Sequence, residues 1–121
     1  MTVTRSAKAY LEAILILEKR NGIARSVDVA RELNFSKPSV SRAIAALRED
    51  GLIEIGCINQ ILLTDEGRKI AEKFHSRRNV INKFLTSAGV DEKTAALDAQ
   101  RLSHIISDEA FVSLKRLLEN N

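Results

Sequence analysis

The chain has 121 residues, of which 45% are hydrophobic and 29% charged, with one proline and five glycines. This composition fits one domain of ordinary size, or a small domain with a helical appendage, and excludes a multi-domain enzyme or a disordered chain. No apolar run approaches the roughly 20 residues of a membrane span, and the N-terminus lacks a signal-peptide pattern, so we expect a cytoplasmic protein without membrane contact. The net charge of +3 permits nucleic-acid binding without establishing it.

Three helices are predicted in the N-terminal half, because apolar residues recur there at helical spacing. The first covers about residues 5 to 20. The second begins with a cap at Ser26 and ends at Asn34, and we expect it to bury Val27, Val29, Ala30 and Leu33. Ser36 caps the third, which ends at Gly51. A short helix and a longer one joined by a very short turn are typical of a helix-turn-helix.

The pattern changes after the third helix. The segments 52–55 and 58–63 are rich in β-branched residues and predict a two-stranded hairpin, or wing. Thr64 then caps a helix that runs to about Ser87, Asp91 begins another, and Ser107 caps the last. The order of these elements is that of a winged helix followed by a helical domain.

The predicted fold class is therefore mainly α. A winged helix-turn-helix, DNA-binding domain is expected over residues 1–70, followed by a helical dimerisation domain over residues 71–121. The apolar stripes of the last three helices exceed what one small domain can cover, so we expect a homodimer.

The third predicted helix has an outward face suited to the major groove of double-stranded DNA. Small residues on this face let the backbone approach closely, and Arg42 can bind guanine with two hydrogen bonds. Serines near its start can donate to phosphates or base edges, and three flanking cations can hold the DNA backbone. The candidate DNA contacts are Arg25, Ser36, Lys37, Pro38, Ser39, Ser41, Arg42 and Arg48.

Two features leave an alternative open. The predicted turn of the wing, Ile58 to Gln60, contains no Lys or Arg, so a phosphate contact there would rest on amide groups. Arg42 also has a plain interpretation as a solvated surface charge. A winged-helix module that binds a protein partner, with only non-specific DNA binding, is therefore the second hypothesis. An enzyme is not expected, because no nucleophile with a base and no glycine-rich phosphate loop is found.

Six segments resemble the diphtheria toxin repressor, or iron-dependent repressor, family of metal-dependent transcriptional regulators. They are AYLEAI (Ala9–Ile14), DVAREL (Asp28–Leu33), SKPSVS (Ser36–Ser41), DGLI (Asp50–Ile53), LTDEGR (Leu63–Arg68) and LSHIISDE (Leu102–Glu109). The resemblance covers almost the whole chain and is of the two-domain, manganese-responsive type. It implies a homodimer that binds a palindromic operator, usually as a repressor. The base-reading positions implied by the family are Ser36, Pro38, Ser39 and Arg42.

The resemblance also implies a site for a divalent transition metal, manganese or iron, but this chain departs from its ligand pattern. Glu12 and His104 keep ligand types at the matching positions, and His75 is one helical turn from a former ligand position. The replaced ligand positions hold Ala9, Arg78, Gln100 and Ser103. An arginine is always protonated and offers no lone pair to a metal. We therefore expect metal control to be lost or altered.

Overall fold

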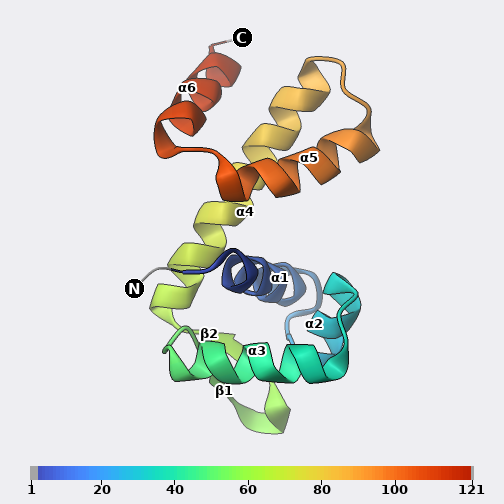
Figure 1. Cartoon of the computed structure of the whole chain (residues 1–121), viewed down its shortest axis with the longest axis vertical. Helices are drawn as coiled ribbons and strands as arrows, with labels where there is room; N and C mark the ends of the chain where they lie inside the picture. Colours follow the sequence, from blue (N-terminus) through green and yellow to red (C-terminus); the bar gives the residue numbers. More distant parts are fainter. Residues whose placement is uncertain (1–2, 121) are drawn as a thin grey trace. The chain divides into compact units, whose positions relative to one another are not determined.

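The computed structural model describes residues 3–120. Its elements are α1 (Arg5–Asn21), α2 (Ser26–Leu33), α3 (Lys37–Glu49), β1 (Ile53–Ile55), the short 3₁₀ turn η1 (Cys57–Asn59), β2 (Ile61–Leu63), α4 (Asp65–Ser87), α5 (Glu92–Ile105) and α6 (Asp108–Glu119) (Figure 1). The mainly helical winged-helix fold class is confirmed. Contacts within the chain separate two compact units, which divide inside α4 between Glu72 and Lys73. None of the helices within residues 3–120 combines the length and apolar character that a membrane crossing requires.

Most predicted helix starts are confirmed by their caps. The hydroxyl oxygens of Ser36 and Ser107 each accept a hydrogen bond from the backbone N–H three residues later, and the Asp91 carboxylate accepts from two N–H groups. Thr64 likewise accepts from Gly67 N at 3.1 Å. These caps satisfy donors that a helix leaves without an internal partner.

The start of α2 corrects two predictions. Arg25, and not Ser26, is the cap of α2, and Ser26 is the first helical residue. The Asp28 side chain accepts a hydrogen bond from Arg25 N at 3.3 Å. Val27 was expected to be buried but is 44% exposed. It lies two residues before Val29, so the two side chains project about 200° apart on the helix.

The core of the first unit is built around α1. Its side chains Leu11, Ile14 and Leu15 are fully buried and pack with apolar residues of α2, α3 and the wing. Two ion pairs link α1 to its neighbours: Arg20 to Glu32 at 2.9 Å, and Arg68 to Glu18 at 2.8 Å. This packing holds α2, α3 and the beginning of α4 as one unit.

The wing is a short antiparallel hairpin in which Ile53 pairs with Leu63 and Ile55 with Ile61. It is fixed to the helices, since Ile61 N donates to Ala24 O at 2.7 Å. Ile58 was predicted both in the turn of the wing and at the start of the second strand; it lies in the connection, in η1, with a φ of 53°. The hairpin therefore has shorter strands and a longer connection than the β-branched pattern indicated.

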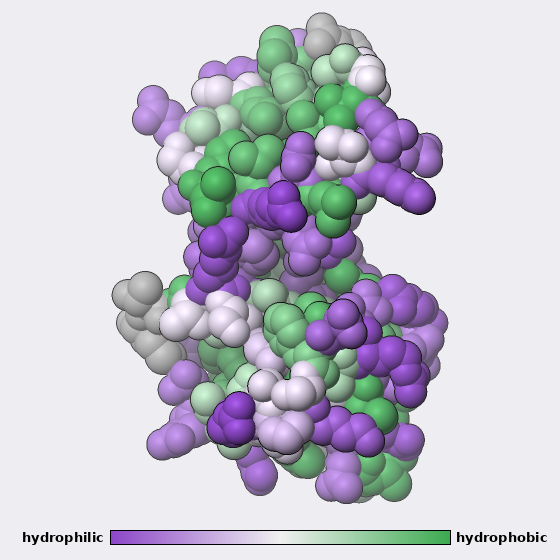
Figure 2. All heavy atoms as spheres, turned by 45° about the vertical axis from the view of Figure 1, so that its right-hand side comes forward, coloured by the Kyte–Doolittle hydropathy of each residue, from purple (hydrophilic) through white to green (hydrophobic). Residues whose placement is uncertain are grey.

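The second unit contains the rest of α4, α5 and α6. Ala95, Ala99 and Ser103 bury one face of α5, whereas no residue of α6 is fully buried. Figure 2 shows hydrophobic side chains at the surface of this unit. The exposed large apolar residues of α5 and α6 are Leu97, Leu102, Ile105, Val112 and Leu117.

Candidate nucleic-acid interface

Helix α3 separates an apolar face from an exposed one. Val40, Ile44 and Leu47 are buried against the other helices. On the opposite side, Pro38, Ser41, Arg42 and Ala45 are all exposed. The packing of the apolar stripe therefore leaves an exposed outer face on which Arg42 is the long cationic side chain.

Hydrogen bonds at the start of α3 orient Arg42. Ser36 Oγ accepts from Ser39 N at 3.3 Å and donates to Ser39 Oγ at 2.9 Å. Arg42 Nη2 in turn donates to Ser39 Oγ at 3.4 Å. The side chain of Arg42 is thus directed along the helix before any ligand is bound, which lowers the entropy cost of using it.

The turn before α3 is held by an aromatic contact. The rings of Tyr10 and Phe35 lie 5.8 Å apart at an interplanar angle of 57°. Burial raises the pKa of the Tyr10 hydroxyl, while the positive charge of Arg42 acts to lower it. The hydroxyl therefore stays neutral at physiological pH, and Tyr10 serves as a packing residue behind α3.

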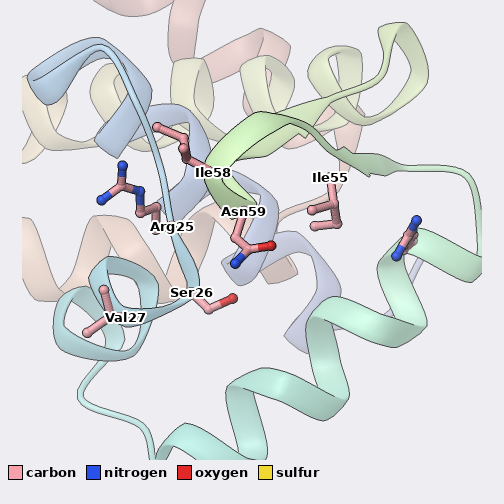
Figure 3. Close-up of a pocket in the computed structure, with 7 residues that line it drawn as sticks. Arg25, Ser26, Val27, Ile55, Ile58 and Asn59 are labelled. Carbon is pink, nitrogen blue, oxygen red and sulfur yellow. The ribbon is translucent and has the colours of Figure 1, made fainter.

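Between α2, α3 and the wing lies a hollow of about 790 Å³, which we call the wing hollow. It is lined by Arg25, Ser26, Val27, Arg48, Ile55, Ile58 and Asn59. In Figure 3, Ser26 and Asn59 point into it from α2 and from the wing. The fold thus brings together Arg25 and Arg48, two of the predicted backbone contacts.

A second hollow, of about 260 Å³, adjoins the first. Lys37 and Ser41 line it together with Val40, and it shares Ser26 and Val27 with the wing hollow. We call these two adjoining hollows together the trough. The sequence analysis did not place Val27 or Ile58 on this surface, because Val27 was expected to be buried and Ile58 carries no charge that marks it.

The residues at the implied metal positions do not fit a divalent ion as a set. Ser103 is fully buried, and its hydroxyl donates to Gln100 O at 2.8 Å, an arrangement without a charged oxygen donor. The His104 ring lies 5.6 Å from the Phe74 ring. Within residues 3–120, no three His, Cys, Asp or Glu side chains gather as a metal site. At Arg78, where the family resemblance implies a ligand, the side chain is a cation with no lone pair for a metal.

Comparison with known proteins identifies the family to which this fold belongs. The family model described as "Iron dependent repressor, N-terminal DNA binding domain" matches residues 2–56, and "Iron dependent repressor, metal binding and dimerisation domain" matches residues 64–121. The chain belongs to the iron-dependent repressor family. The family resemblance expected from the sequence is thereby confirmed.

Relatives in this family are transcriptional regulators and not enzymes, in agreement with the sequence prediction. The transcriptional regulator MntR of Escherichia coli is 36% identical over 84% of this chain and 66% of its own length. MntR of Salmonella typhimurium is 34% identical over 84% of this chain and 65% of its own. The chain thus spans just under two thirds of the length of these two relatives.

Several solved structures have a fold similar to that of this chain. A metal-dependent transcriptional regulator, MtsR, superposes with a TM-score of 0.85 at 24% identity, covering 98% of this chain and 55% of that one. IdeR of T. acidophilum gives 0.81 at 24% identity, covering 98% and 55%. These likenesses bear on the fold alone. A hypothetical protein of Sulfolobus solfataricus has a TM-score of 0.69 at 22% identity, covering 98% of this chain and 91% of that one.

Proposed function

We propose that the chain is a sequence-specific DNA-binding transcriptional regulator, acting as a repressor in the cytoplasm. The observation that carries this proposal is the outer face of α3, where small residues surround Arg42 and Ser39 orients it. Such a face can lie in the major groove with the guanidinium at a guanine edge. Family membership supports the same function.

The eight candidate contacts divide into two groups according to whether they line the two hollows. Ser36, Pro38, Ser39 and Arg42 belong to the start and the outer face, which we assign to the bases. Lys37, Ser41, Arg25 and Arg48 line the trough, which we assign to the DNA backbone. Backbone contacts set the orientation of the protein on DNA, whereas base contacts select the sequence.

We further propose that the chain acts as a homodimer on a palindromic operator. The exposed apolar residues of α5 and α6 support this, since Ile105 is 63% exposed and Leu117 is 53% exposed. A second copy that packs on this surface would remove it from water. A two-fold axis would place two α3 helices on two operator half-sites. The proposed functional domains are the DNA-binding residues 1–70 and the dimerising residues 71–121.

We propose that DNA binding by this chain does not require a metal ion. The family model of the second unit describes metal binding. In this chain, however, Arg78 and the hydrogen-bonded Ser103 stand where the family pattern has ligands. Glu12, His104 and His75 remain as ligand types, and we expect them to hold manganese or iron(II) too weakly for control.

Operator selection with purified protein tests the DNA-binding proposal. We expect enrichment of a palindrome, and Arg42→Ala should relax selection at one base position in each half-site and weaken operator binding by about 1–3 kcal/mol. Lys93→Ala is the matched control, because it removes the same charge from α5 of the second unit and leaves selection unchanged.

The same experiment separates the alternative hypothesis. A winged-helix module that binds a protein partner would bind DNA without preference. If no sequence is enriched and Arg42→Ala binds like the control, the regulator proposal is wrong.

A further inference from the structure

Ile58 is in an unusual position at the turn of the wing. Its side chain is 67% exposed, and its φ of 53° lies in the left-handed region. This region is rarely adopted by β-branched residues, because the side chain crowds the backbone. An exposed isoleucine with strained backbone contributes little packing to the free protein. Such strain is often kept where a side chain has to meet a ligand.

The surroundings of Ile58 indicate the chemistry of that ligand. The wing hollow joins two guanidinium groups, Arg25 and Arg48, to the apolar side chains Val27, Ile55 and Ile58, and none of its lining residues is acidic. In Figure 3, Arg25 and Ile58 lie on the same side of the hollow. A ligand that alternates anionic and apolar groups would satisfy both kinds of residue.

The place of the hollow narrows the choice to a DNA strand. Through Ser26 and Val27, it continues into the smaller hollow lined by Lys37 and Ser41 of α3. A strand that follows this trough passes three cations and then the wing. Its phosphates fit the cations, and its deoxyribose rings offer the apolar surface.

We propose that Ile58 packs against a deoxyribose of the DNA strand whose neighbouring phosphates bind Arg25 and Arg48. The wing would then bind DNA through an apolar contact, although its turn contains no lysine or arginine. This inference rests on the proposed DNA-binding function and adds the wing and its mode of contact to it. The contact is independent of base sequence, because every nucleotide carries the same sugar.

Salt dependence distinguishes the apolar contact from the ionic ones. Removing a phosphate contact lowers the slope of log affinity against log salt by about 0.9, because one counterion fewer is released. We expect this for Arg48→Gln. Replacing Ile58 removes buried apolar surface and leaves the slope unchanged, and the expected loss of affinity is on the order of tenfold.

The test measures binding of the full chain to a random-sequence DNA duplex over a series of salt concentrations. Ile58→Asn is the main variant, since asparagine tolerates a positive φ, so the protein should melt at the same or a higher temperature. Ile58→Leu keeps the apolar contact and should bind like the parent. Leu62→Asn is the matched control: Leu62 is an exposed apolar residue of the wing, but it pairs with Glu54 and lies outside the hollow.

Among the three wing variants, only Ile58→Asn is expected to lose affinity, at an unchanged salt slope and with undiminished stability. If Ile58→Asn binds the duplex as the parent does, the sugar contact is wrong while DNA binding stands. Equal losses in Ile58→Asn and Leu62→Asn would also overturn it. If the parent binds neither this duplex nor a selected operator, the proposed function fails, and this inference fails with it.

Discussion

At the scale of single residues, Gly67 fixes the junction between the wing and α4. A Cβ at this position would lie 2.0 Å from the carbonyl oxygen of Leu52. That oxygen accepts from Thr64 N at 3.2 Å, so the backbone has little freedom to retreat. Glycine is therefore required by close approach of two backbone segments.

We predict that Gly67→Ala lowers the free energy of unfolding by about 2–4 kcal/mol, because the backbone must shift to relieve the overlap. Gly22→Ala is the control. Its φ is 79° but nothing lies near its Cβ position, so only the conformational cost of about 1–2 kcal/mol is expected. Urea denaturation compares the two variants, and an equal loss in both would contradict the close-approach argument.

Residues whose role is local could be predicted from the sequence. Ser36, Asp91 and Ser107 cap helices as expected, since a cap depends on a few adjacent residues. The conformation of Ile58 could not be predicted, because its β-branched type favours a strand and its positive φ is set by the hairpin connection. The wing hollow was not predicted for the same reason, because it is formed in part by this hairpin connection.

At the scale of elements, Arg77 ties α4 to the start of α6. Its side chain is 8% exposed; Nη1 donates to Ile106 O at 3.1 Å, and Nη2 donates to the Asp108 carboxylate. The guanidinium carbon also lies 5.7 Å from the centre of the Phe74 ring and 5.0 Å from that of Phe111. One buried cation thus joins an ion pair and two aromatic faces, and it positions α6 within the second unit.

This ion pair gives a prediction in acid. The hydrogen bond from Arg77, and then the charge of Lys73, hold the pKa of Asp108 below its ordinary value of 3.8. Folding therefore favours the carboxylate, and its stabilising effect is present above the ordinary pKa and lost as the pH falls through the lowered one. We expect Asp108→Asn to be less stable than the parent at neutral pH, with the difference vanishing in acid.

Thermal or denaturant unfolding as a function of pH measures this difference. Glu109→Gln is the control, because it removes a carboxylate from the same first turn of α6 without touching the Arg77 contact. A stability difference for Asp108→Asn that persists unchanged in strong acid would contradict the assignment.

The helices themselves were predictable, whereas the partners of their side chains were not. The period of apolar residues and the caps gave α1, α3 and α4 nearly to their ends. Arg77, for example, is buried by contacts with α6 and with two aromatic rings. Such contacts join residues far apart in the chain, and local periodicity carries no information on them.

At the scale of the whole molecule, the apolar surface of α5 and α6 requires a partner in the proposed account. We predict that Leu117→Glu weakens self-association by at least about tenfold, because a carboxylate buried at the interface would lose its hydration. Analytical ultracentrifugation over a range of protein concentrations measures this. Leu62→Glu, which alters an exposed apolar residue of the wing, should dimerise as the parent does, and equal behaviour of the two variants would contradict the assigned surface.

The domain order could be predicted from the sequence, since the period changes from helix to hairpin and back to helix. The metal question could not be decided by spacing, because Glu12 belongs to the first unit and His75 and His104 belong to the second. What the sequence does supply is donor chemistry. At two positions where the resemblance implies ligands, Arg78 has no lone pair and Ser103 has no charge to offer a divalent metal.

The most direct test of the account is the affinity of the metal-stripped protein for its selected operator, measured again after manganese or iron(II) is added. We predict tight binding by the stripped protein and an affinity that changes by less than about twofold with metal. A metal ion that binds the free and the DNA-bound protein equally well does not shift the DNA-binding equilibrium. Operator binding only in the presence of metal would contradict the account. It would mean that Glu12, His75 and His104 take part in a working metal site.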